Sequence, residues 1–170
     1  ADTCYDTKRI PDYIEMALRN AVSGNPGPAF LEIPMDVLSG EVEWDEVRMP
    51  KMRPEAPLLT PAMTDINEAA GILAGAERPV MMVGTSVKWS NASGAVQKFI
   101  EQTHIPTFVN GMGRGTVKPG TTELLNRVRK EAIKQCDVFV CAGVLLDFRL
   151  GYGNTIPADA KVIQLDLENE

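Results

Sequence analysis

The sequence predicts an α/β protein whose parallel sheet is covered by helices on both faces. Short apolar runs alternate with amphipathic helical patterns along residues 61–170. These runs lack the polar alternation of strands that face water on one side, so both faces of each strand are expected to be buried. Each run is followed by glycine, asparagine or aspartate, as is common where a strand turns into a crossover. Together these observations indicate a Rossmann-like sheet.

The 170 residues suffice for one domain and a fragment of a second. Residues 1–38 contain a helix at 10–22, with apolar positions at helical spacing, and a short strand at 29–33. We interpret them as a helix-strand remnant at the end of a preceding α/β domain. Residues 39–60 are rich in proline and show no sustained period, which predicts an extended linker. Residues 61–170 are assigned to the second domain.

The second domain contains four predicted strands, each separated from the next by one helix or a loop. The predicted strands are 79–83, 106–109, 137–142 and 161–165. The predicted helices run from Thr60 or Thr64 to about 76, from about 91 to 103, and from about 121 to 135, the last being basic.

The composition excludes some classes of partner. The chain has 17 basic and 23 acidic residues, a net charge of −6, and no basic run, so we expect no nucleic-acid partner. Its apolar runs are too short to span a bilayer, and we expect no membrane partner. The three cysteines form no CxxC pair, which fits a reducing compartment, and the predicted localisation is cytoplasmic.

The candidate site lies at the carboxyl ends of the predicted strands, where open parallel sheets bind nucleotides. The residues at these ends are Gly84, Thr85 and Ser86 after the first strand, Gly111, Met112 and Gly113 after the second, Gly143, Asp147 and Arg149 after the third, and Asp166 after the fourth. Each also has a simpler interpretation. The glycines can be turn residues, Met112 can fill the core, Asp147 and Arg149 can form a surface pair, and Asp166 can cap a helix. Taken together, they favour nucleotide binding.

A catalytic constellation is not recognisable. The sequence contains no P-loop, no nucleophile elbow and no HExxH zinc motif. The single histidine, His104, precedes Ile105-Pro106 and is interpreted as a helix-end residue. We therefore predict no catalytic residue and no metal ligand in this chain, and we expect any reaction to be completed by other parts of an enzyme.

Several segments resemble one enzyme family. Residues 27–38, GPAFLEIPMDVL, resemble the segment that closes the pyrimidine-binding domain of thiamine-diphosphate enzymes in the acetolactate synthase and 2-hydroxyacyl-CoA lyase group. The remainder is similar to the central domain of these enzymes, most distinctively at residues 146–153, LDFRLGYG. The resemblance covers nearly the whole chain.

In that family the central domain holds FAD, an adenine nucleotide or the ADP part of coenzyme A. The resemblance implies backbone contacts from Gly84, Thr85 and Ser86, and an adenosine ribose held by Asp166. It also implies contacts around a group of residues after the third strand, namely Gly143, Val144, Asp147 and Arg149. Arg149 is suited to a diphosphate because its planar fork donates in pairs. Leu145 stands where acetolactate synthases have an arginine, which argues against the flavin contacts.

The resemblance implies a fragment of a thiamine-diphosphate-dependent carbon–carbon lyase or synthase that is not catalytic alone. Thiamine diphosphate and Mg²⁺ would bind in the pyrimidine-binding and diphosphate-binding domains of the same enzyme, outside this chain, and the enzyme would be a homo-oligomer. The alternative is a non-catalytic nucleotide-binding or structural module whose loops serve oligomer packing.

Overall fold

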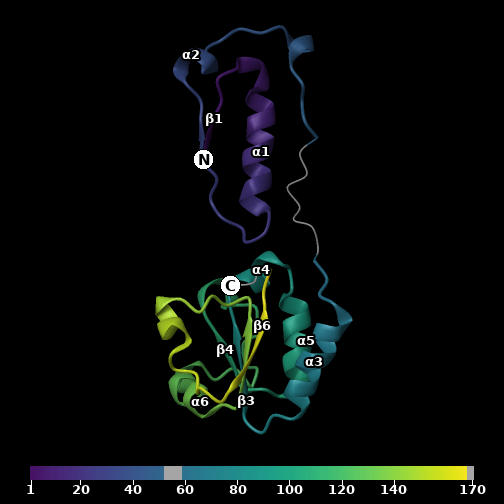
Figure 1. Cartoon of the computed structure of the whole chain (residues 1–170), viewed down its shortest axis with the longest axis vertical. Coiled ribbons are helices and arrows are strands. Elements are labelled where there is room, and N and C mark those ends of the chain that lie inside the picture. The colour runs from purple at the N-terminus through teal and green to yellow at the C-terminus, as the bar shows by residue number, and fades with distance from the viewer. Residues whose placement is uncertain (52–58, 168–170) are drawn as a thin grey trace. The chain divides into compact units, whose positions relative to one another are not determined.

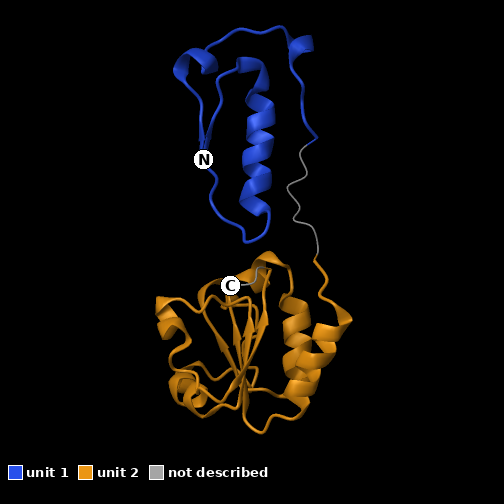
Figure 2. Ribbon diagram, viewed as in Figure 1, with its two compact units in different colours: residues 1–58 blue, residues 59–170 orange. Residues whose placement is uncertain are grey.

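The computed structural model of the chain describes residues 1–51 and 59–167. The chain divides into two compact units, Ala1–Leu58 and Leu59–Glu170 (Figure 2). Part of the predicted linker, including Pro54 and Pro57, lies outside the described residues. The assignment of residues 1–38, 39–60 and 61–170 to a remnant, a linker and a central domain stays a prediction.

The first unit contains one long helix and a two-stranded parallel sheet (Figure 1). Helix α1, Ile10–Val22, has the predicted bounds, and the Ser23 Oγ donates to the Arg19 carbonyl at 2.6 Å where it ends. Strand β2, Leu31–Glu32, is shorter than predicted and pairs with β1, Asp2–Thr3. The sequence analysis missed β1 because its residues are polar. A short helix α2, Met35–Leu38, and a 3-10 helix, Trp44–Glu46, follow.

The first unit has almost no core of its own. Among its described residues only Cys4 is buried. Large apolar side chains are instead exposed, including Phe30 at 66% and Trp44 at 76%. The packing within this unit therefore contributes little hydrophobic stabilisation.

The second unit contains a four-stranded parallel sheet with the order β4-β3-β5-β6. The strands are β3 (Pro79–Val83), β4 (Thr107–Val109), β5 (Val138–Ala142) and β6 (Lys161–Leu165). The chain runs outward from β3 to β4 and then crosses to β5 on the other side of β3. The strand order therefore reverses between β3 and β5, the kind of switch point where doubly wound sheets bind ligands.

Helices and loops cover both faces of this sheet, as predicted (Figure 1). Helices α3 (Met63–Ala74) and α5 (Ser93–Thr103) pack on one face, against side chains such as Met81 and Val83. Helix α6 (Arg129–Gln135) and the 3-10 segment Phe148–Gly153 pack on the other, against side chains such as Val80 and Met82. Successive residues of a strand point to opposite faces, which explains the continuous apolar runs. No helix in the described part of the chain is long and apolar enough to cross a membrane.

The predicted helix over 121–135 is wrong in its first half. The chain there pairs with the start of β4: the Thr107 amide donates to the Glu123 carbonyl at 2.7 Å, and the Leu125 amide donates to the Thr107 carbonyl at 3.0 Å. His104 ends α5 in the left-handed region, as a helix-end residue, and its Nδ1 lies 2.6 Å from Glu123 Oε1. The hydrogen bond to His104 lowers the pKa of Glu123. These long-range contacts outweigh the local helix propensity.

Smaller differences concern helix ends. Helix α3 begins at Met63 after Ala62, and no threonine side chain caps it. Helix α5 begins at Ser93 instead of residue 91, because Asn91 has a φ of +52°. Gly84 is followed directly by a five-residue helix, α4 (Thr85–Trp89), whose first two residues are the predicted site residues Thr85 and Ser86.

The carboxylate of Asp137 connects the amino ends of β3 and β5. It accepts hydrogen bonds from the amides of Glu77 at 2.6 Å and Arg78 at 2.9 Å. The Arg78 Nε also donates to the Gln135 carbonyl at 2.8 Å. The bond from Glu77, reinforced by that from Arg78, lowers the pKa of the Asp137 carboxyl. The charged carboxylate therefore stabilises the folded unit.

We expect Asp137→Asn to lower the free energy of unfolding at neutral pH, because an amide group offers only one acceptor oxygen to the two donors. The folded-state pKa is lowered, so this stability is present above the unfolded-state pKa and is lost as the pH falls through the folded-state pKa. In urea titrations, the difference from the wild type should be constant above about pH 5 and shrink below about pH 4. Asp159→Asn, at an exposed position, is the control. An undiminished difference at about pH 3 would contradict the assignment.

Candidate functional site

The structure brings the predicted site residues to one edge of the sheet in the second unit. Gly84, Asn110, Gly143 and Asp166 directly follow β3, β4, β5 and β6. Because the four strands are parallel, their carboxyl ends lie at the same edge (Figure 1). The sequence-based placement of these ends is therefore confirmed, whereas the roles of the individual residues stay predictions.

The loops after β3 and β5 pack directly on each other at the switch point. The Gly84 amide donates to the Ala142 carbonyl at 2.8 Å, and the Ser86 amide donates to the Gly143 carbonyl at 3.2 Å. A Cβ on Gly84 would overlap the Gly143 carbonyl oxygen, and Gly143 has a φ of +61°. The close approach of the two backbones thus requires glycine at both positions.

The loop after β4 is fastened to the start of α4. It forms a 3-10 turn, Gly111–Gly113, in which the Met112 amide donates to Thr85 Oγ1 at 3.3 Å. A Cβ on the buried Gly113 would overlap the Val83 carbonyl oxygen. Met112 is 44% exposed, so it does not fill the core.

The hydrogen-bond donors at this edge fall into two groups. The amides of four glycine-loop residues already donate to main-chain carbonyls: Gly84 to Ala142, Ser86 to Gly143, Gly113 to Asn110 and Gly143 to Leu165. The amides of Thr85 and Val144 donate to no acceptor among residues 1–51 and 59–167. The amides of three further predicted site residues, Gly111, Asp147 and Asp166, likewise donate to no acceptor among these residues. Thr85 and Val144 are thus two of the five predicted site residues with main-chain donors left for a ligand.

Asp147 and Arg149 form a closed pair after β5. The Arg149 Nε and Nη2 donate to Asp147 Oδ2 at 2.8 and 2.5 Å, and the Arg149 amide donates to Asp147 Oδ1 at 2.9 Å. The hydrogen bond from Arg149 lowers the pKa of Asp147, and Asp147 in turn raises the pKa of Arg149. The guanidinium also lies 5.9 Å from the centre of the Phe148 ring. The charge of Arg149 is thus compensated within the turn.

Asp166 has an unused acceptor at the end of β6. Its Oδ1 accepts from the Leu167 amide at 2.8 Å, whereas its Oδ2 is buried and has no hydrogen-bond partner in the described part of the chain. Burial, followed by the charge of Asp166, raises the pKa of the Cys141 thiol to about 12. A buried acceptor without a donor costs free energy, so this oxygen favours a donor supplied from beyond the described residues.

The sequence analysis missed a buried polar residue that holds the loop after β4. Gln97 on α5 is 7% exposed, and its Oε1 accepts from the Lys118 amide at 2.9 Å. Its Nε2 donates to Glu101 Oε1 at 2.8 Å. The sequence could have indicated that Gln97 is buried, because Gln97 lies beside Val96 and one turn before Ile100 on the helix.

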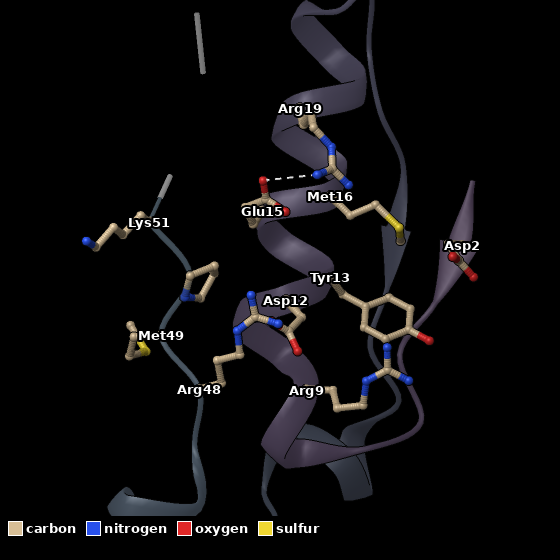
Figure 3. Close-up of a pocket in the computed structure, with 11 residues that line it drawn as sticks. Asp2, Arg9, Asp12, Tyr13, Glu15, Met16, Arg19, Arg48, Met49 and Lys51 are labelled. Atoms are coloured by element: carbon tan, nitrogen blue, oxygen red, sulfur yellow. Dashed lines mark hydrogen bonds and ion pairs between the residues drawn. The ribbon is translucent and has the colours of Figure 1, made fainter. Parts of the chain in front are cut away.

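A groove of about 760 Å³ lies in the first unit, between α1 and residues 48–51 (Figure 3). Its lining carries charges of both signs, with Arg48 and Lys51 on one side and Asp12 and Glu15 on the helix. No predicted site residue lies there. Within the described residues, no group of three or more His, Cys, Asp or Glu side chains is arranged to hold a metal ion.

Comparison with known proteins adds independent information. The family model described as "Thiamine pyrophosphate enzyme, central domain" matches residues 66–170. The chain is 38% identical over 154 residues to a probable acetolactate synthase from Mycobacterium bovis, covering 90% of this chain. It is 33% identical over 173 residues to a 2-hydroxyacyl-CoA lyase from Arabidopsis thaliana, covering 97%, and 32% identical over 155 residues to an oxalyl-CoA decarboxylase from Escherichia coli, covering 89%. The chain spans only 28%, 30% and 28% of these relatives.

Proposed function

The chain belongs to the thiamine pyrophosphate enzyme family, whose central domain it carries at residues 66–170, and from this premise we propose that its second unit binds the ADP part of a nucleotide cofactor or of coenzyme A. The proposed site is the carboxyl edge of the sheet, between the loops that follow its four strands. The ADP part is common to FAD and coenzyme A, so the proposal fits both.

The observation that carries this proposal is the buried Oδ2 of Asp166, which has no hydrogen-bond partner among residues 1–51 and 59–167. An acidic side chain at the end of a strand is where Rossmann-type sheets accept the hydroxyl groups of an adenosine ribose. A ribose hydroxyl would supply the donor that Asp166 Oδ2 lacks. The unused amides of Thr85 and Val144 supply donors for phosphate oxygens at the neighbouring strand ends.

We further propose that the whole enzyme forms or cleaves a carbon–carbon bond next to a carbonyl group. Thiamine diphosphate, bound with Mg²⁺, supplies the stabilisation of a carbanion in such reactions. In this proposal those groups bind to domains outside this chain, and the enzyme is a homo-oligomer. The part of the chain that the structure describes would contribute nucleotide binding and no catalytic group.

Calorimetric titration of the chain with ADP, coenzyme A and FAD tests the proposal. We expect ADP to bind, and Asp166→Ala to weaken ADP binding about 10-fold or more through the loss of a charge-assisted hydrogen bond. The same substitution should leave the free energy of unfolding unchanged or raise it, because it removes an unsatisfied buried acceptor. Asp159→Asn, at an exposed position, is the control.

The outcomes separate the candidate functions. If the folded chain binds none of the three ligands, the nucleotide site is refuted and the packing role of the loops is favoured. A yellow protein, or FAD binding much tighter than that of coenzyme A, would favour a flavin enzyme similar to acetolactate synthases. Tighter binding of coenzyme A would favour an enzyme similar to the acyl-CoA lyases.

A further inference from the structure

The nucleotide site needs a positive charge that Arg149 is poorly placed to give. A diphosphate carries negative charge into an edge that already holds Asp147 and Asp166. Two of the five N–H donors of the Arg149 guanidinium already bind Asp147, and the charge of that carboxylate compensates the positive charge of Arg149. The ion pair with Asp147 therefore weakens the attraction of Arg149 for a phosphate. A cation without such a partner at the same edge is better suited to bind the diphosphate.

Three further basic side chains follow β3 and β4: Lys88 in α4, and Arg114 and Lys118 in the loop after β4. Lys118 Nζ lies 4.0 Å from Glu101 Oε1 on α5. Lys88 and Arg114 are exposed, and their side chains form no hydrogen bond or ion pair with any residue that the structure describes. Lys88 and Arg114 are thus the unpaired cations among these three side chains, and their positions in the fold distinguish them.

Arg114 directly follows the 3-10 turn Gly111–Gly113, which is fixed against the start of α4 by the bond from the Met112 amide to Thr85 Oγ1. The Thr116 Oγ1 also donates to the Gly113 carbonyl at 2.6 Å, and Thr116 is buried. These bonds hold the Cα of Arg114 close to Thr85, a residue with an unused amide. Lys88, by contrast, lies in the last turn of α4, away from its beginning.

We propose that Arg114, and not Arg149, is the side chain that binds the diphosphate of the nucleotide; this inference rests on the proposed function. A guanidinium can donate two parallel hydrogen bonds to a phosphate, and a cation without a partner loses no existing ion pair when it does so. Arg149 then has a structural role, in which it holds the turn after β5 through Asp147.

Titrations of the full chain with ADP and with adenosine test this assignment. We expect Arg114→Gln to weaken ADP binding about 10-fold and adenosine binding less than about two-fold, because adenosine has no phosphate. The dependence of the ADP dissociation constant on salt should also become less steep in this variant. Lys88→Gln, which removes an unpaired cation of the same edge, is the matched control.

Arg149→Gln provides the opposing test. If Arg149→Gln weakens ADP binding as much as Arg114→Gln or more, Arg114 is not the diphosphate ligand although the proposed function stands. Equal losses for ADP and adenosine in Arg114→Gln would also overturn the assignment, since they would show a general disturbance of the loop. If the wild type binds neither ligand, the proposed function fails and this inference fails with it.

Discussion

Replacing Gly84 with alanine is expected to destabilise the second unit by about 3 kcal/mol, the upper range for forcing extra atoms into a packed interior. Gly84 has a φ of −118°, which any residue can adopt, so the cost is entirely one of space. The added Cβ would overlap the Gly143 carbonyl oxygen and lie 2.8 Å from Val144 Cγ2. Relief would require β3 and β5 to separate at the centre of the sheet.

Gly71→Ala is the matched control for this prediction. Gly71 lies within α3, and a Cβ there would meet nothing within 4 Å. Because alanine is the better helix former, we expect this variant to gain about 0.5–1 kcal/mol. Urea titrations followed by circular dichroism measure both, and a Gly84→Ala sample that is unfolded without urea counts as a large loss. Equal stability of the two variants would show that the two loops do not touch as described.

The glycines of this edge illustrate how far sequence analysis could go. Gly84, Gly113 and Gly143 were predicted as site residues from their positions after apolar runs, and the structure places them in the loops that follow the strands. Glycine is required wherever a backbone is closely approached, whether by a ligand or by another part of the same chain. At Gly84 the approaching backbone is that of Gly143, 59 residues later in the sequence. No local sequence pattern contains that information.

The elements show the same division between local and long-range causes. The strands of the second unit were predicted nearly to the residue, because burial of both faces leaves a continuous apolar run. The segment 121–125 was assigned to a helix from its local composition, yet its main chain pairs with Thr107 at the sheet edge. The charge of Arg149 was recognised as suitable for phosphate, but its compensation by Asp147 depends on the backbone of the turn.

Replacing Phe108 with alanine is expected to cost about 3–5 kcal/mol, the range observed when a buried phenylalanine is truncated. Phe108 lies in β4, is fully buried, and belongs to the core on the α6 side of the sheet. The loss combines the transfer free energy of the ring with the cavity left behind. Urea unfolding of the full chain, monitored by circular dichroism, measures it.

Phe30→Ala is the matched control, because the same truncation is made in the first unit at a side chain that is 66% exposed. It should change the free energy of unfolding by no more than about 0.5 kcal/mol. The contrast also tests the energetic difference between the units, since the described residues of the first unit bury only Cys4. If Phe30→Ala costs as much as Phe108→Ala, Phe30 must be covered in solution. The first unit would then owe its stability to contacts beyond those within its described residues.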